Sequence, residues 1–264
     1  MAGLIQFPNH HVYPGRVFGK LYPKFSKKML HFENYATTAL PMPPPRCDWT
    51  RGFNINYGMM LNDTLGDCVE AAKGHAIQTL TLDNGRMSTV PDSVTLADYE
   101  ANGGYVPGDP STDNGENEVD SLTAWQKSPT GVAGFLLSGY AGIKLTLIEH
   151  VQQCIWLMGG TFGGLQVPQS AMDQNAAGQV WDVVQNDGGI VGGHAVWVCM
   201  YDAVHNLFAC ITWGGIQLFT WAFWQAYFDE SYALKVPVWE GKRGVAPSGF
   251  LASQWDADVV QLAA

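Results

Sequence analysis

Apolar and polar positions follow two different periods along this 264-residue chain. Apolar residues at helical spacing predict helices over 68–82, 93–101, 118–127, 146–158, 219–228 and 253–263. Apolar runs bounded by turn residues predict strands over 136–145, 159–167, 190–201, 207–213 and 232–238. Residues 168–187 show neither period and are expected to be irregular. The helices come mostly first and antiparallel strands follow, an order typical of an α+β fold.

The first 45 residues differ from the rest, because they are rich in proline, aromatic and basic residues. They end in Leu40-Pro41-Met42-Pro43-Pro44-Pro45, which is incompatible with a helix or a central strand. We interpret residues 1–45 as an arm laid over the domain formed by residues 46–264. A cover for the site, in the manner of a propeptide, is the less favoured alternative.

The formal charge of −10 makes nucleic acid an unsuitable partner for the whole molecule. Residues 1–30 contain five basic and no acidic residues, which leaves nine basic and 24 acidic residues, a charge of −15, for the remainder. The basic arm therefore either lies along the acidic body or docks an anionic partner.

Five cysteines form an odd set without ligand-type spacing, which argues against a disulfide framework and against a zinc site. The acidic loop at 103–117 does not have the spacing of a calcium-binding loop. We therefore expect no metal and no cofactor. The chain has no signal-peptide pattern and no apolar run of about 18 residues, so we expect no membrane span and a cytoplasmic or virion-associated protein. The sequence carries no signal for an oligomeric state.

Cys68 stands at the head of the first predicted helix, behind the turn-forming stretch Asn62 to Asp67. There the free first-turn amides and the helix dipole favour the thiolate, which is the nucleophilic form. The amide of Asn62 would point back at the group that Cys68 attacks. The simpler interpretation is a buried cysteine that follows a loop.

A cysteine nucleophile needs a base within hydrogen-bonding reach. His75 lies seven residues along the same helix, about 10 Å away, and is interpreted as structural. His194 opens an apolar strand behind two glycines, Gly192 and Gly193, which leave room beside it. A core histidine is the alternative explanation at this position.

Three segments together carry a resemblance: Asn62 to Cys68, Gly-His-Ala-Val at 193–196, and Thr-Trp-Gly at 212–214. In this order they resemble the papain-like cysteine peptidase superfamily. The fuller pattern NDxxGDC…GGH…TWG is similar to an uncharacterised group of bacterial and phage proteins. The resemblance implies a papain-like fold, in which a helical lobe bearing the nucleophile helix packs on an antiparallel sheet lobe.

The resemblance also implies roles for individual residues. Cys68 would be the nucleophile and His194 the base, while Asn62 with the Cys68 amide would stabilise the oxyanion. Trp213 would shield the histidine from water. Trp213 and Trp181 would form either a hydrophobic subsite or, more simply, plain core, and Gly193 is a further candidate binding residue.

Two positions depart from the family pattern. Asn62 replaces a glutamine, and Ile211 stands where the family has the asparagine that orients the histidine. Thr212 is expected to face away, because side chains alternate along a strand. The orienting side chain is then absent, or it comes from Gln166, Asp173 or Asp182.

These features predict a cysteine hydrolase that cleaves a peptide or amide substrate through an acyl-enzyme, using a Cys-His dyad. The substrate would lie between the helix at 68–82 and the hairpin of His194, with loops 103–117 and 168–187 as walls. The alternative is an inactive papain-like module with a binding or structural role in a phage particle or at a cell surface.

Overall fold

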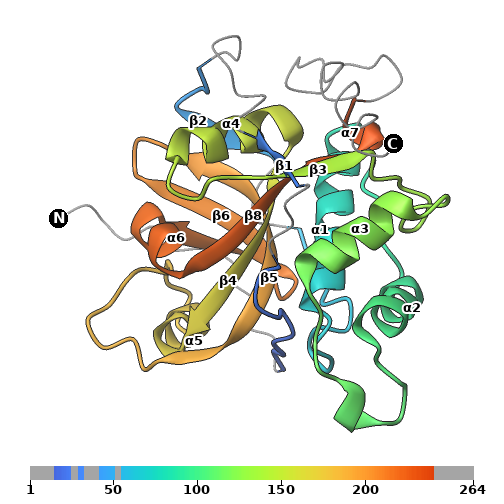
Figure 1. The fold of residues 1–264 in the computed structure, drawn as a ribbon. Helices are drawn as coiled ribbons and strands as arrows, with labels where there is room; N and C mark the ends of the chain where they lie inside the picture. Colours follow the sequence, from blue (N-terminus) through green and yellow to red (C-terminus); the bar gives the residue numbers. More distant parts are fainter. Residues whose placement is uncertain (1–14, 25–28, 33–41, 51–54, 241–264) are drawn as a thin grey trace.

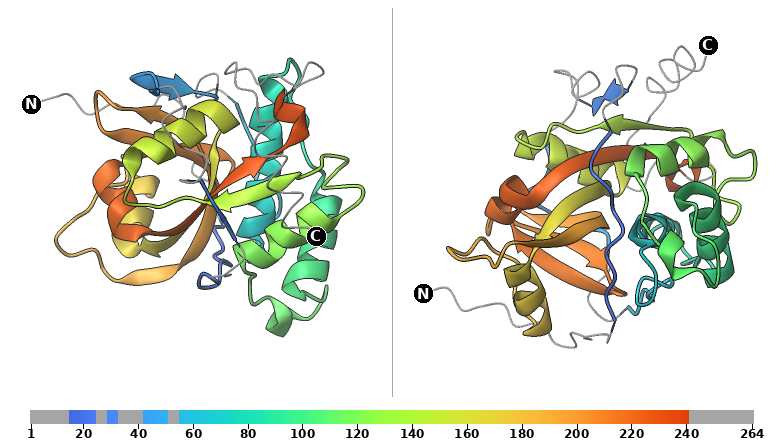
Figure 2. Two further views of the ribbon diagram at one scale, coloured as in Figure 1. Left: turned by 45° about the horizontal axis from the view of Figure 1, so that its top comes forward. Right: turned by 60° about the horizontal axis from the view of Figure 1, so that its bottom comes forward.

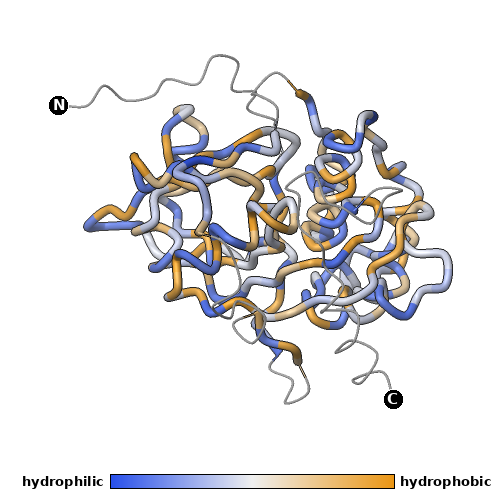
Figure 3. Tube along the Cα trace, turned by 90° about the horizontal axis from the view of Figure 1, so that it is seen from above, coloured by the Kyte–Doolittle hydropathy of each residue, from blue (hydrophilic) through white to orange (hydrophobic). Residues whose placement is uncertain are grey.

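A computed structural model describes residues 15–24, 29–32, 42–50 and 55–240 of the chain. Within them a helical lobe lies beside a sheet lobe, as Figures 1 and 3 show from two directions. The helical lobe contains α1 (Cys68–Leu82), α2 (Asp92–Gly103), the short 3-10 helix η2 (Pro110–Thr112) and α3 (Glu118–Lys127). Asn117 caps α3 by accepting hydrogen bonds from the backbone amides of Val119 and Asp120, which fixes where this helix begins.

The sheet lobe is built on a sheet in the order β1-β3-β8-β4-β5-β6-β7, with β2 paired to β5. The strands are β1 (Leu30–His31), β2 (Arg46–Asp48), β3 (Gly139–Gly142), β4 (Thr161–Pro168), β5 (Ile190–Asp202), β6 (Leu207–Thr212), β7 (Gly215–Thr220) and β8 (Phe228–Lys235). The pairs are antiparallel except β1 with β3, which is parallel.

The two faces of the sheet bury separate cores. On one face α1 packs on side chains of β5 and β6 that include Ala195, Trp197 and Ile211. The other face carries Val196 and the helices α4 (Ile148–Met158), α5 (Gln169–Ala176) and α6 (Trp221–Tyr227). A final short helix, α7, covers Pro237–Glu240. Because α1 rests on β5, the head of the first long helix is brought to the strand that carries His194.

The α+β class predicted from the sequence is confirmed, and the predicted helix at 118–127 has its expected bounds. The expectation that 168–187 is irregular was wrong, since α5 forms there. The helix predicted at 219–228 begins only at Trp221, because the two residues before it belong to β7. The predicted helix at 253–263 lies outside the described residues. None of the helices in the described ranges is long and apolar enough to span a membrane.

Candidate active site

Cys68 is the first residue of α1, and its side chain is buried at the seam between the lobes. The backbone amide of Ala195, the residue after His194, lies within hydrogen-bonding reach of the Cys68 sulfur. The backbone amide of Gly19 lies there too. The nucleophile candidate and the backbone beside the base candidate therefore meet.

His194 is buried on β5, with its ring held on three sides. Its Nε2 lies 2.7 Å from the hydroxyl of Thr212. The indole of Trp213 stacks on the imidazole at 4.4 Å between ring centroids, and Phe18 meets it edge-on at 5.9 Å. The other ring nitrogen, Nδ1, is buried with no hydrogen-bond partner among the described residues. The ring is thus oriented through Nε2, and Nδ1 is free to exchange a proton.

The expectation that Thr212 faces away from the histidine was wrong. The register pairs Trp197 of β5 with Ile211 of β6, so Ile211 points to the face that α1 covers. Alternation then directs Thr212 to the opposite face, on which His194 lies. The strands alternate as expected, but it is Thr212, and not the residue at position 211, that shares a face with the base.

The three alternative orienting residues are engaged elsewhere. Gln166 donates to Asp229 at 2.7 Å, and Asp173 accepts a hydrogen bond from Gln169. Asp182 accepts from the hydroxyl of Thr220.

The two candidate tryptophans lie in different surroundings. Trp181 is fully buried in the core, 5.3 Å from Phe223 and 6.1 Å from Trp213 between ring centroids. Trp213 covers His194, and its backbone φ of +44° is rare for a bulky residue. The guanidinium of Arg16 lies 5.3 Å from the centre of its ring. Trp213 therefore separates the imidazole from solvent. Trp181 packs against Trp213 from within the core.

Asn62 is buried before α1 with its side-chain amide already in use. Its Nδ2 donates to the carbonyl of Val17 at 3.0 Å and to that of Leu65 at 3.1 Å. Its backbone carbonyl accepts from the amide of Val17. The group expected to stabilise an oxyanion thus binds a carbonyl of the N-terminal segment.

Residues 15–24, called the strap here, run along the seam between the lobes, as the dark blue trace in the right view of Figure 2 shows. The Lys20 amide donates to the carbonyl of Gly193 at 3.1 Å. On the opposite side, the Leu21 amide donates to Glu116, and the Glu116 amide donates to Gly19. The strap thus bridges both lobes over Cys68 and His194.

Glycines make this close crossing possible. A Cβ on Gly193 would lie 2.2 Å from the Lys20 carbonyl oxygen, and one on Gly192 would lie 2.6 Å from the Phe18 ring. A Cβ on Gly19 would lie 1.6 Å from the carbonyl oxygen of Gly66, and one on Gly115 would lie 1.9 Å from that of Gly19. The room expected behind His194 is filled by the strap.

Burial sets the protonation of the candidate dyad. It raises the pKa of Cys68 to about 12, although the amides of Ala195 and Gly19 oppose the shift. Burial and the nearby His75 lower the pKa of His194 to about 3. With the strap in place, the pair near neutral pH is therefore a thiol and a neutral imidazole. The pKa of Asp67 is raised to about 8 by burial, and the Asn62 amide partly opposes this shift.

No protein-family model matches the chain, and no curated protein matches its sequence. Solved structures do match its fold. Xylellain, a cysteine protease from Xylella fastidiosa, is 17% identical over 85% of this chain and 99% of its own, with a TM-score of 0.64. Procathepsin B S9 from Trypanosoma congolense is 12% identical over 84% of this chain and 86% of its own, with a TM-score of 0.51.

Digestive procathepsin L 3 from Tenebrio molitor is 12% identical over 82% of this chain and 75% of its own, with a TM-score of 0.50. The chain has a papain-like fold. The predicted papain-like fold is confirmed, and the likeness to the bacterial and phage group stays a prediction. At such low identity the papain-like fold alone is shown, and the roles of Cys68, His194 and Asn62 depend on the local geometry.

Two features of this candidate site did not follow from the sequence. One is the Thr212 hydroxyl on His194, which depends on the register of β5 against β6. The other is the side chain of Lys20, which is buried between Asp229 and Glu230. The neighbouring glycines at 192 and 193 were a signal of close backbone approach, but they did not identify the segment that approaches.

Proposed function

We propose that the protein is a cysteine hydrolase that cleaves an amide or peptide bond through an acyl-enzyme. One observation carries this proposal: the Cys68 sulfur lies against the backbone of Ala195, while the adjacent His194 is held through Nε2 and keeps Nδ1 unpaired. A thiol that meets the backbone next to an oriented imidazole, with one ring nitrogen unpaired, supports nucleophilic catalysis by this pair.

The reaction begins when the strap leaves the seam. Water and substrate then replace apolar contacts around Cys68 and His194, which lowers the pKa of the thiol and raises that of the imidazole. Nδ1 of His194 takes the thiol proton as the sulfur attacks the substrate carbonyl carbon. The Asn62 side-chain amide and the Cys68 backbone amide stabilise the resulting oxyanion.

Collapse of the tetrahedral intermediate breaks the carbon–nitrogen bond, and His194 returns its proton to the leaving amine. Water then attacks the thioester, with His194 taking one of its protons, and the acid product leaves as the thiol is regenerated. Throughout, Thr212 keeps the imidazole oriented, which is the part an asparagine plays in the family that the sequence resembles.

The strap is incompatible with this reaction while it is bound. The carbonyl of Val17 occupies the Asn62 amide, and Gly19 occupies the space at the Cys68 sulfur. We infer that the structure represents a covered, silent arrangement of the hydrolase. A permanently inactive module is the competing proposal, which the buried, protonated Cys68 thiol favours.

Intact-mass labelling separates the two proposals. The full chain is treated with iodoacetamide and with a panel of peptidyl and acyl electrophiles, before and after limited proteolysis. We expect one adduct that is lost in Cys68→Ala and kept in Cys199→Ala, a matched removal of another fully buried thiol. A folded protein in which Cys68 stays unmodified after the strap has been cleaved and released would contradict the hydrolase proposal.

A further inference from the structure

Lys20 of the strap places an ammonium group where no solvent reaches it. Its side chain is 0% exposed, and its Nζ lies 2.8 Å from Asp229 and 2.9 Å from Glu230. Burial alone would lower the pKa of Lys20, but Glu118, Glu230 and Asp229 outweigh burial and raise it. The lysine therefore stays charged inside the protein.

The pocket around Lys20 is formed by both lobes. Glu118 comes from the start of α3, whereas Asp229 and Glu230 come from β8. Its floor is Gly164 of β4, where an added Cβ would lie 2.0 Å from Lys20 Cε and 2.6 Å from Glu118 Oε1. The glycine leaves the space that a long side chain fills.

Glu118 is fully buried beside the Lys20 side chain. Both of its carboxylate oxygens are buried without a hydrogen-bond partner among the described residues, and the side chain faces the Lys20 stem across Gly164. Desolvation of a carboxyl group without a partner is costly, and a cation held beside it offsets that cost. Among the described residues, the Lys20 ammonium group is the cation that pairs with Asp229 and Glu230.

The pocket lies one residue from the nucleophile along the strap. The Gly19 amide reaches the Cys68 sulfur, and the Lys20 amide binds the carbonyl of Gly193, beside the base. An extended chain advances about 3.3 Å per residue. A peptide that follows this path therefore places a side chain in the pocket within two residues of the bond that Cys68 attacks.

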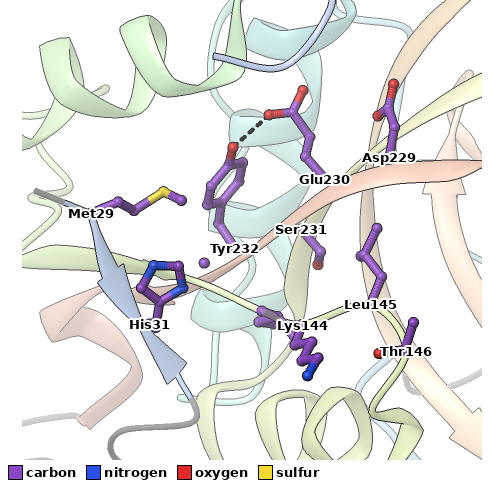
Figure 4. Close-up of a pocket in the computed structure, with 11 residues that line it drawn as sticks. Met29, His31, Lys144, Leu145, Thr146, Asp229, Glu230, Ser231 and Tyr232 are labelled. Carbon is purple, nitrogen blue, oxygen red and sulfur yellow. Dashed lines mark hydrogen bonds between the residues drawn. The ribbon is translucent and has the colours of Figure 1, made fainter. Parts of the chain in front are cut away.

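Space for the neighbouring part of such a peptide exists beyond the same two acids. Asp229 and Glu230 also border a cavity of about 360 Å³, which Figure 4 shows between β1 and β8 with Met29, His31 and Tyr232 around it. In this view the Glu230 carboxylate points away from the cavity and is bonded to the Tyr232 hydroxyl. The other carboxylate oxygen of Glu230, Oε1, binds the Lys20 ammonium group.

We propose that the pocket of Glu118, Asp229 and Glu230 is the specificity subsite of this enzyme, and that it takes a lysine or arginine side chain of the substrate once the strap has withdrawn Lys20. The proposal rests on the proposed hydrolase function and adds a substrate class to it: peptides with a basic residue within two positions of the cleaved bond.

Peptidyl chloromethyl ketones test the proposal on the full chain. Lysine, arginine, norleucine or glutamate is placed in turn at each of the three residues nearest the reactive carbon, and the rate of Cys68 modification is measured. The wild type and Lys20→Ala are compared, with circular dichroism to check that the variant is folded. Norleucine has the length of lysine without its charge and isolates the contribution of the ammonium group.

At one position we expect the lysine or arginine probe to react about 10- to 100-fold faster than norleucine, because charge-assisted hydrogen bonds contribute about 1.5–3 kcal/mol. Glu118→Gln and Glu230→Gln should each reduce this preference severalfold. Asp120→Asn, an exposed acid on the same helix that pairs with Lys24, should leave it unchanged.

Iodoacetamide separates the two levels of failure, since it carries no side chain for the pocket. If iodoacetamide modifies Cys68 and norleucine probes react as fast as basic ones at every position, the subsite proposal is overturned and the hydrolase proposal stands. If Lys20→Ala is folded and no reagent modifies Cys68, the hydrolase proposal fails and the subsite fails with it. If Lys20→Ala does not fold, the wild type decides the question. Strap opening lowers the reaction rates of all probes by the same factor, so the ratio of basic to norleucine rates is kept.

Discussion

The hydroxyl of Thr212 lies 2.7 Å from Nε2 of His194, on a face of the sheet that both residues share. The sequence resemblance expects the residue that orients the imidazole at position 211. The contact shows that the next residue, Thr212, is bonded to the imidazole instead. It also explains how Ile211 is compatible with an active site, since Ile211 packs against the nucleophile helix on the other face.

Thr212→Val keeps the shape of the side chain and removes its hydroxyl. We expect kcat/KM to fall at least ~10-fold, because the ring loses its orienting partner, and the free energy of unfolding to fall by about 1–3 kcal/mol through the unpaired buried nitrogen. Thr212→Ser, which keeps the hydroxyl, should retain most of the activity. Equal activity in the valine and serine variants would remove Thr212 from the positioning role, and an unchanged pH profile of kcat/KM in Thr212→Val would do the same.

Lys20→Met should uncover the site in the intact chain. Breaking a buried ion pair from one side costs about 3–5 kcal/mol, so the strap should open more often and iodoacetamide should modify Cys68 at least ~100-fold faster. Lys24→Met is the matched control, because Lys24 is in the same segment but its side chain is 61% exposed in its pair with Asp120. There we expect less than about a threefold change, as exposed ion pairs contribute little. Similar rates in the two variants would show that the buried pair does not hold the strap.

Asn62→Ala should move two measurements in opposite directions. Its amide holds the Val17 carbonyl at 3.0 Å, so its loss should loosen the strap and speed iodoacetamide labelling of Cys68 by about three- to tenfold. The same loss removes an oxyanion donor and should lower kcat by about 100-fold with the best amide substrate of the probe series. A rise in both quantities would assign Asn62 to the strap alone.

Asp67→Asn should change how stability depends on pH. Burial raises the pKa of Asp67 from 3.8 to about 8, so between these values the folded state holds a proton that the unfolded state has lost. The contribution of this group to the free energy of unfolding therefore falls as pH rises through this window, by at most about 1.4 kcal/mol per pH unit. The asparagine variant lacks this loss, so its stability relative to the wild type should increase from pH 5 to pH 8 in urea denaturation. Parallel pH profiles would contradict a buried, protonated Asp67.

The parts of the fold that local patterns determine were predictable. The helix α3 has the bounds Glu118–Lys127 that its spacing predicted, because Asn117 supplies a cap next to a periodic segment. The hairpin of β5 and β6 followed from two apolar runs around a polar turn. The helix α5 was missed because its eight residues are mostly polar, so it has little helical apolar periodicity of its own.

Features of the site that depend on tertiary contacts were not predictable. Cys68, His194 and Asn62 were chosen as candidates from local context and order, but the partner of His194 depends on a register that no single strand encodes. Lys20 looked like one of several basic residues in an arm. Its acidic partners lie in α3 and β8, and only the packing of the two lobes brings them together around it.

A Cβ on Gly19 would lie 1.6 Å from the carbonyl oxygen of Gly66, far inside van der Waals contact. A substitution as small as Gly19→Ala therefore prevents the segment from seating, although it alters no charge and none of the reacting groups. Resting activity of the proposed hydrolase would thus be adjustable by a steric change at one backbone position, independently of catalytic power. For the same reason, a synthetic inhibitor copied from residues 15–24 must keep an unsubstituted α-carbon at that point.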